Sequence, residues 1–272
     1  SSNIASAQVK SAILLAGLYA DSETSVTEPE LSRDHTERLL RAFGAELTST
    51  KTDAGAVSMI QPCNELFGRK FLTWRHFFRS VLYRCRTACP TLRDCYKNVG
   101  INPTRAGILS VCEAMGADIT YLSKTNDGGE PTADLLIRTS ELHGTVIEGS
   151  QIPTLIDEIP MIAVLAACAE GTTIIRDAAE LKVKETNRID TVTENLKKMG
   201  ADVTPTDDGM IIRGKTPLHG AVIDSYFDHR IAMAFSIAAL VADGTTTIQN
   251  SSCVDVSYPD FYRTLYHLRE EN

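Results

Sequence analysis

Three charged residues stand close together where the sequence predicts the start of a helix. Lys184, Glu185 and Arg188 belong to the run Lys-Glu-Thr-Asn-Arg. Residues four positions apart share one face of a helix, so Lys184 and Arg188 would project side by side. Two neighbouring cations repel each other unless an anion lies between them. The spacing therefore indicates either a bound anion or an ordinary solvated charged face.

Two more charged residues introduce apolar helices. Asp157 lies in the apolar run PTLIDEIP, where its neighbours would raise the pKa of a carboxyl group and suit it to accept a proton. The same position also suits an ordinary N-cap aspartate. Arg230 follows Asp228 and His229 at the start of the last Ala-rich helix. A charge beside an apolar helix needs a partner, so Arg230 indicates either a bound anion or an internal ion pair.

A third group precedes two helices near the N-terminus. Ser6, Ala7 and Gln8 come just before an apolar helix, whose free N–H groups and partial positive charge suit a phosphate. Ser6 would serve equally well as a simple N-cap. Arg33 lies at the mouth of the next helix, where its guanidinium can bind phosphate through two hydrogen bonds. The alternative for Arg33 is a surface salt bridge to Glu30 or Glu37.

The elements that would position these residues form an internal repeat. Three segments share a β-branched run, a polar turn, a helical stretch and a final Gly-Ala-acid: Val26–Leu47, Tyr96–Ile119 and Ile174–Val203. Their glycines stand where a helix ends in a left-handed residue: Gly44, Gly116 and Gly200. Asn102 and Pro103 predict an N-cap followed by Pro at the first helical position.

A second recurrent element is an Ala-rich helix followed by a polar turn and a Thr-rich strand. It occurs in Ser6–Thr27, Asp157–Ile175 and Asp228–Ile248. A third recurrent piece, Leu-X-Gly, introduces the helices at Leu66–Gly68, Leu142–Gly144 and Leu218–Gly220. Each full unit would run strand, helix, strand, helix, strand, with its apolar helices buried. The sequence therefore predicts an α/β fold built from a repeated module.

Composition excludes several classes of protein. The 272 residues include 35 acidic and 27 basic side chains, and the net charge of −8 disfavours nucleic-acid binding. Seven cysteines without a CxxC pair argue against a zinc ribbon and for a reducing compartment. We expect no membrane span, since no apolar stretch looks long enough. The N-terminus lacks both an initiator Met and a basic segment, so we expect an incomplete chain rather than a signal peptide.

One stretch breaks the repeat. Between Gly68 and Asn98, where another Ala-rich helix should recur, the chain holds Trp74, three cysteines and several arginines, among them Arg75, Arg79, Arg84 and Arg86. A basic–aromatic nucleic-acid patch and a metal site are two possible interpretations, although the Cys spacing fits no standard site. We favour a third. Reading permitted codons for Thr73–Thr87 one nucleotide later restores an Ala-rich helix, which indicates a compensated frameshift over roughly residues 69–97.

Seven motifs, in their order, resemble the 5-enolpyruvylshikimate-3-phosphate synthase family, which belongs to the enolpyruvyl transferases. They are Ser6-Ala7-Gln8, Ser32-Arg33-Asp34-His35, Asn102-Pro103-Thr104-Arg105, Pro153 to Glu158, Lys184-Glu185-Thr186-Asn187-Arg188, Asp228-His229-Arg230 and Ser257-Tyr258-Pro259. The resemblance implies an enzyme of the shikimate pathway of aromatic amino-acid biosynthesis, the target of glyphosate. It would transfer the enolpyruvyl group of phosphoenolpyruvate to the 5-hydroxyl of shikimate 3-phosphate and release phosphate.

The resemblance also assigns residues to this reaction. It implies that shikimate 3-phosphate binds Ser6, Ala7, Gln8, Arg33, Asp157 and Lys184. Phosphoenolpyruvate would bind Gln8, Arg188 and Arg230. The catalytic residues would be Asp157 as base, Glu185 as the group exchanging a proton at the enol methylene, and Lys184. Asp255 stands where some members carry a Lys for phosphoenolpyruvate, so that contact is not expected here.

The implied fold is a two-lobed inside-out α/β barrel of repeated βαβαββ units that binds its substrates between the lobes. Residues 1–69 would be the C-terminal part of the N-terminal lobe, and 70–272 the C-terminal lobe. The chain would then be about the last two-thirds of such an enzyme, and by itself weakly active or inactive. The resemblance implies no cofactor or metal, a cytoplasmic location, and a monomer when complete, with no nucleic-acid or membrane partner.

Two alternatives remain open from the sequence. The related enolpyruvyl transferase that acts on UDP-N-acetylglucosamine shares the fold and the chemistry, but lacks the combination of Lys184–Arg188 and Asp228–Arg230 motifs. The chain could also be a non-catalytic binding module. A comparison of activity with shikimate 3-phosphate and with the nucleotide sugar distinguishes the two transferases. A phosphate-release assay distinguishes an enzyme from a non-catalytic binding module.

Overall fold

A computed structural model of the protein describes residues 1–53, 55–68, 93–127 and 129–270. The chain divides into two units. The first contains residues 1–68 with Tyr96–Gly107 and Tyr121–Leu135, and the second contains Ile108–Thr120 with the residues from Leu136 onward. The predicted lobe boundary at residue 69, and most of the stretch interpreted as a frameshift, lie outside the described residues. Both stay predictions.

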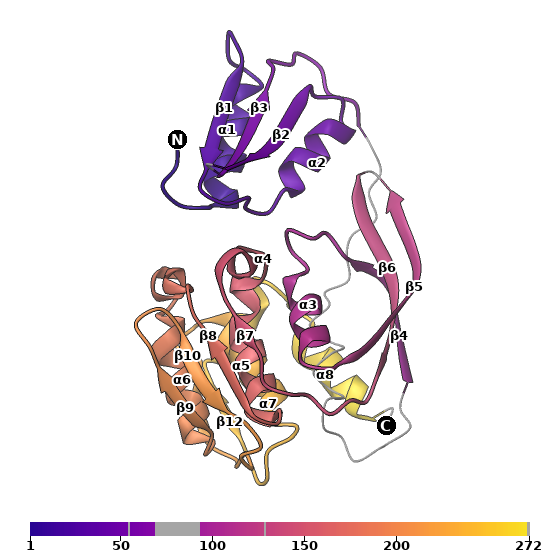
Figure 1. Cartoon of the computed structure of the whole chain (residues 1–272). Coiled ribbons are helices and arrows are strands. Elements are labelled where there is room, and N and C mark those ends of the chain that lie inside the picture. The colour runs from indigo at the N-terminus through magenta and orange to yellow at the C-terminus, as the bar shows by residue number, and fades with distance from the viewer. Residues whose placement is uncertain (54, 69–92, 128, 271–272) are drawn as a thin grey trace. The chain divides into compact units, whose positions relative to one another are not determined.

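The first unit begins with two helices that pack on a small antiparallel sheet (Figure 1). Its elements are α1 (Ala7–Gly17), β1 (Thr24–Glu28), α2 (His35–Ala42), β2 (Leu47–Thr52) and β3 (Gly55–Ile60). β3 is the central strand and pairs with both β1 and β2. The side chains buried between the helices and the sheet include Leu14, Val26, Leu40, Leu47 and Ile60. This core fixes α1 and α2, which begin next to predicted site residues.

The middle of the chain forms a three-stranded sheet and one helix. The strands are β4 (Arg93–Gly100), β5 (Asp118–Asp127) and β6 (Glu130–Arg138), in the order β4–β6–β5, and the helix is α3 (Gly107–Ala114). The last residues of the interrupted stretch, 93–97, therefore lie in a regular strand. The prediction that Asn102 caps a helix is wrong, because α3 begins five residues later. Asn102 instead caps a turn, where its side-chain oxygen accepts from the Thr104 N–H at 3.0 Å.

The second unit holds a four-stranded sheet of order β7–β8–β10–β9 and a two-stranded parallel sheet. The strands are β7 (Val146–Ile147), β8 (Thr172–Ile175), β9 (Asp202–Pro205), β10 (Met210–Arg213), β11 (Val222–Asp224) and β12 (Thr247–Gln249). The α-helices are α4 (Ile152–Leu155), α5 (Ile159–Cys168), α6 (Arg188–Lys198), α7 (His229–Ala238) and α8 (Phe261–Glu270). Short 3-10 helices are η2 (Gly149–Gln151), η3 (Ile156–Glu158), η4 (Ala179–Val183) and η5 (Ser251–Val256).

Burial of the Ala-rich helices is confirmed for two of the three. Nearly every residue of α5 and α7 is buried. In α1 only Lys10, Leu14 and Gly17 are buried, and Val9 and Leu15 are exposed. The reason is that α5 and α7 pack against each other, whereas among the described elements α1 packs mainly on β1 and β3.

The expectation that no stretch reaches membrane-spanning length is wrong by length and composition alone. The helical run Gly149–Cys168 has 20 residues and a mean hydropathy of 1.4 in its most apolar window. However, 72% of that window is buried inside the protein, and the run is divided into η2, α4, η3 and α5. Such burial is typical of a core helix.

The internal repeat is confirmed by recurrent hydrogen bonds. Gly44, Gly116 and Gly200 all have positive φ, and the alanine after each donates to a carbonyl five residues back at 2.9–3.0 Å. This is the Schellman ending of a helix. The residue before each glycine accepts a further bond from Phe67, His143 or His219. The Leu-X-Gly pieces at 142–144 and 218–220 thus dock on the preceding helix and lead into β7 and β11.

Candidate functional site

The guanidinium of Arg188, the first residue of α6, gathers three carboxylates in the second unit. Its Nε donates to Asp228 Oδ2 at 2.8 Å, and its Nη2 donates to Asp228 Oδ1 at 3.3 Å and to Glu185 Oε2 at 2.5 Å. Its Nη1 lies 3.4 Å from Asp157 Oδ1. The side chain is only 1% exposed. Asp157 and Glu185, which sequence reasoning assigned as base and proton exchanger, therefore both contact Arg188, the assigned cation.

Asp228 is the anchor of this cluster, although sequence reasoning did not select it as a site residue. It is fully buried and caps α7 by accepting from the Arg230 N–H at 2.8 Å. Its other oxygen also accepts from the hydroxyl of Thr186 at 3.2 Å. An aspartate directly before an apolar helix was the available signal, because a buried carboxylate there must find a cation.

Charge and burial compete at this cluster. Burial alone would lower the pKa of Arg188, but the hydrogen bond and charge of Asp228, with the charges of Glu185 and Asp157, outweigh it and raise the pKa. The opposite holds for His229, the first residue of α7. Burial, followed by the positive charge of Arg230, lowers the pKa of its imidazole below 6.5. His229 is thereby favoured in its neutral form.

Arg230 and Lys184 have partners of their own. Arg230 Nη1 lies 3.3 Å from Oε1 of Glu158, a buried carboxylate that sequence reasoning did not select as a site residue. The predicted alternative of an internal ion pair for Arg230 is thus confirmed. Lys184 forms an ion pair with Glu180.

The expectation that Lys184 and Arg188 share a helical face is wrong. Lys184 lies at the end of η4 with extended backbone, and α6 begins only at Arg188. The cap of α6 is Asn187, which accepts from the Asp190 N–H. The capping alternative for Asp157 is also wrong, since Asp157 lies inside η3 and Glu158 is the residue before α5.

In the first unit, Ser6 is the N-cap of α1, as its capping alternative predicts. Its hydroxyl accepts from the Val9 N–H at 3.4 Å. Ala7 and Gln8 are the first two helical residues, and Gln8 is exposed. Arg33 is partly buried two residues before α2. The carboxylates named as alternative partners for Arg33 pair with lysines: Glu30 with Lys51 and Glu37 with Lys10.

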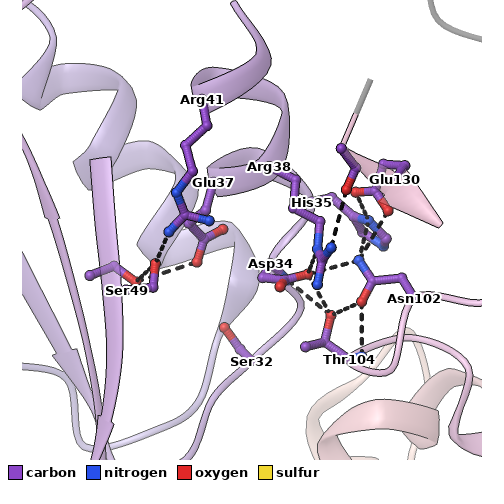
Figure 2. Close-up of polar contacts among 12 residues, drawn as sticks. Ser32, Asp34, His35, Glu37, Arg38, Arg41, Ser49, Asn102, Thr104 and Glu130 are labelled. Carbon is purple, nitrogen blue, oxygen red and sulfur yellow. Dashed lines mark hydrogen bonds and ion pairs between the residues drawn. The ribbon is translucent and has the colours of Figure 1, made fainter. Parts of the chain in front are cut away.

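A polar network joins two motifs that are far apart in the sequence (Figure 2). Asp34 Oδ1 accepts from Arg38 Nε at 2.8 Å, from the Asn102 amide at 2.7 Å and from the Thr104 hydroxyl at 2.9 Å. Burial would raise the pKa of Asp34, but these three hydrogen bonds outweigh it and lower the pKa. The network extends to His35 and Glu130, whose side chains share a hydrogen bond of 2.8 Å. The residue after Arg33 is therefore firmly held.

The described parts of the chain contain His, Cys, Asp and Glu side chains, which are the usual protein ligands of metal ions. Within those parts, no group of three or more His, Cys, Asp or Glu residues could hold a metal ion. Among the described residues, these cysteines are not joined in a disulfide: Cys63, Cys95, Cys112, Cys168 and Cys253.

Comparison with known proteins gives a consistent result. Residues 1–265 match the family model described as EPSP synthase (3-phosphoshikimate 1-carboxyvinyltransferase). The 3-phosphoshikimate 1-carboxyvinyltransferase of Geobacillus thermodenitrificans is 54% identical over 270 residues, which are 98% of this chain and 62% of the relative. That of Shouchella clausii is 52% identical over 267 residues, covering 98% of this chain and 61% of the relative.

A solved structure, the EPSP synthase from Acinetobacter baumannii, is similar with a TM-score of 0.86 and 42% sequence identity. The match covers 97% of this chain and 60% of that one. The likeness confirms the predicted fold class, the two-lobed inside-out α/β fold. The chain spans about 60% of the length of the relatives that it matches.

Proposed function

Because the chain belongs to the EPSP synthase family, we propose that the protein transfers the enolpyruvyl group of phosphoenolpyruvate to the 5-hydroxyl of shikimate 3-phosphate. The reaction is an addition followed by an elimination. The 5-hydroxyl oxygen attacks the enol carbon while the methylene gains a proton, and loss of a methyl proton then expels phosphate. It requires cations for the anionic substrates, a base for the hydroxyl and an acid for the methylene.

One observation carries the proposal: Arg188 holds Asp157 and Glu185 on two different nitrogens of one guanidinium. A cation for phosphoenolpyruvate, a base and a proton exchanger are thereby within one hydrogen-bond shell. Structural ion pairs rarely need three carboxylates for one buried arginine, because each uncompensated buried charge is costly. The cluster holds three carboxylates for one guanidinium. A carboxylate that is not needed to balance the charge of Arg188 can take part in proton transfer.

The proposed roles in the second unit follow from this geometry. The anion of phosphoenolpyruvate takes the place of Glu185 on Arg188 Nη2, which frees the Glu185 carboxyl group for the enol methylene. Glu185 is half-exposed, so it can leave the contact without being buried unpaired. Arg230 adds a second cation for phosphoenolpyruvate. Lys184, released from Glu180, binds the shikimate phosphate, and Asp157 accepts the proton of the 5-hydroxyl.

The first unit contributes residues to shikimate 3-phosphate. The α1 N-terminus, with Ser6 and Ala7, offers backbone N–H groups to the phosphate. Gln8 is exposed beside them and reaches both substrates. Arg33 supplies a charge-assisted hydrogen-bond pair to the phosphate.

Further properties belong to the same proposal. The protein acts as a monomer in the cytoplasm, without a cofactor, in the synthesis of aromatic amino acids. The family is the target of glyphosate, and at position 255 this chain has Asp where some members carry a lysine for phosphoenolpyruvate.

The test is a phosphate-release assay on the protein expressed from the complete reading frame that contains this chain. With phosphoenolpyruvate, we expect release in the presence of shikimate 3-phosphate and none with UDP-N-acetylglucosamine. Release with the nucleotide sugar alone would assign the protein to the related transferase. Binding of shikimate 3-phosphate without release from the complete protein would make it a binding module.

A further inference from the structure

We propose that Lys10 is a positioning residue that holds Arg33 in place for the phosphate of shikimate 3-phosphate. The inference rests on the proposed function, since it takes Arg33 as a substrate-binding residue. Lys10 belongs to no motif that sequence reasoning selected. In the run AQVKSAILLAG its charge would ordinarily lie at the surface of the helix.

The structure instead buries Lys10, which is 1% exposed. It lies one turn after Ser6, and its N–H donates to the Ser6 carbonyl at 3.0 Å. Its ammonium lies 2.7 Å from Glu37 Oε1 and 3.1 Å from Glu28 Oε2, and it donates to the Ser32 carbonyl at 3.2 Å. The three donors of one ammonium group thus reach α2, β1 and the residue before Arg33.

Both polar groups of Ser32 are held by this cluster. Its carbonyl accepts from Lys10, and its hydroxyl donates to Glu28 at 2.7 and 2.9 Å. On the other side of Arg33, Asp34 is held by Arg38, Asn102 and Thr104. Arg33 therefore stands on a backbone segment that is fixed at both ends.

The charge of the cluster argues against a purely structural role. One ammonium faces two buried carboxylates, so the group carries a surplus negative charge, and Glu37 Oε2 is buried without a hydrogen-bond partner among the described atoms. Apolar residues of similar volume would join these elements at lower cost. What they could not do is donate to the Ser32 carbonyl. Alignment of Arg33 with the α1 N-terminus, both assigned to the same phosphate, is the function that requires the lysine.

The experiment uses the protein from the complete reading frame and measures KM for each substrate, kcat and thermal unfolding. Ser32→Ala and Ser58→Ala are a matched pair. Both remove a buried serine hydroxyl that donates to a buried glutamate, but Ser58 lies on β3 and donates to Glu37 at 3.4 Å. We expect Ser32→Ala to raise KM for shikimate 3-phosphate about 3–10-fold, the range of one lost hydrogen bond, and Ser58→Ala to leave it unchanged.

A second pair of variants separates the effect of Lys10 on the position of Arg33 from its effect on the stability of the fold. Lys10→Met removes the only cation that the described residues place in this cluster and is expected to destabilise the fold. Lys10→Met with Glu37→Gln restores the original charge of the cluster but not the donor to Ser32. We expect the double variant to regain thermal stability while KM for shikimate 3-phosphate stays raised at least tenfold, as it does for Arg33→Ala. The kcat and the KM for phosphoenolpyruvate should change little.

The outcomes are distinct. Recovery of KM together with stability in the double variant would overturn the inference, as would equal KM values for Ser32→Ala and Ser58→Ala. If Lys10→Met fails to fold, the comparison of Ser32→Ala with Ser58→Ala and the double variant still test the inference. Absence of turnover by the wild-type protein would instead overturn the proposed function.

Discussion

At the scale of single residues, the charge balance around Arg188 decides which groups can move. One guanidinium faces Asp157, Glu185 and Asp228. Asp228 is fully buried and holds Arg188 through two hydrogen bonds, so its release would leave an unpaired charge in the core. Glu185 is 50% exposed and can turn to solvent or substrate. Asp228 is therefore the fixed partner of Arg188, and Glu185 is the exchangeable one.

Replacement of the exchangeable carboxylate tests its catalytic role. Glu185→Gln keeps the shape but removes the proton donor, so kcat should fall about 100-fold or more while KM changes less than about threefold. Glu194→Gln is the control, since Glu194 is a similarly exposed glutamate of the same unit paired with Lys198. Steady-state kinetics of both variants decide the matter. An unchanged kcat for Glu185→Gln would remove this residue from the mechanism.

His229 predicts how stability depends on pH. Burial and then the charge of Arg230 lower the pKa of its imidazole from 6.5 in the folded protein. The unfolded chain thus binds this proton more readily, so the stability contributed by His229 is complete above pH 6.5 and is lost as pH falls below it. The free energy of unfolding, measured by denaturant titration, should depend less on pH between 7 and 5 in His229→Gln. Equal slopes for the variant and the wild-type protein would contradict the assignment.

Site residues could be predicted from the sequence where several charged residues stand close together in one motif. Asp157, Glu185 and Arg188 were selected, and the structure places them in contact. Asp228 and Lys10 were not selected as site residues, because their partners are distant in sequence. Lys10 meets Glu28 and Glu37 only after β1 and α2 fold against α1. Burial of a single lysine in an apolar helix can be predicted only when the carboxylates that pair with it are known to lie nearby.

At the scale of elements, the repeated segments fold alike because the same backbone contacts recur in them. Gly144 approaches the first residue of β8, and Gly220 approaches the backbone just before β12, so closely that a Cβ would lie 2.2 Å from the Thr172 carbonyl oxygen and 2.3 Å from that of Thr245. Each glycine also donates to a carbonyl across an equivalent parallel bridge. The Leu-X-Gly piece thus sets the pairing of the parallel strands β7–β8 and β11–β12. These pairs place η3, which carries Asp157, and the start of α7, where Asp228 is the N-cap.

Substitution of the second of these glycines tests the packing. Gly220→Ala should destabilise the protein by about 1–3 kcal/mol, because the Thr245 backbone must shift to admit a methyl group. The Tm should fall by about 2–4 °C for each kcal/mol. Gly68→Ala is the control, since a Cβ there meets none of the described atoms within 4 Å. Equal Tm values for the two variants would show that the close approach carries no strain.

Helix endings were more predictable than helix beginnings. The Gly-Ala pair identifies the left-handed residue and its hydrogen bonds by chemistry that only glycine satisfies readily. The helices predicted to begin at Pro103 and at Lys184 both begin four residues later, at Gly107 and Arg188. In both places the chain first forms a turn whose polar side chains bind one another. Tertiary contacts of Asn102 with Asp34 and Glu130 stabilise that turn, and the sequence alone does not reveal them.

At the scale of the whole molecule, the charge distribution opposes the proposed substrates unless cations act at close range. The chain carries a net charge of −8, and both substrates are anions. The net charge of the chain therefore supplies no long-range attraction, and binding depends on local cations and direct contacts. The assigned cations come from both units: Arg33 from the first, and Lys184, Arg188 and Arg230 from the second.

It follows that shikimate 3-phosphate should affect the two units together. Hydrogen exchange of the complete protein should slow in the first turn of α1 and around Arg33, and equally around η3 and Lys184, when this ligand is added. Inorganic phosphate at the same concentration is the control, because it supplies the anion without the hydroxyls assigned to Asp157. It should slow exchange at the phosphate-binding residues and leave η3 unchanged. Protection by shikimate 3-phosphate that stays within one unit would show that the residues assigned in the other unit do not bind it.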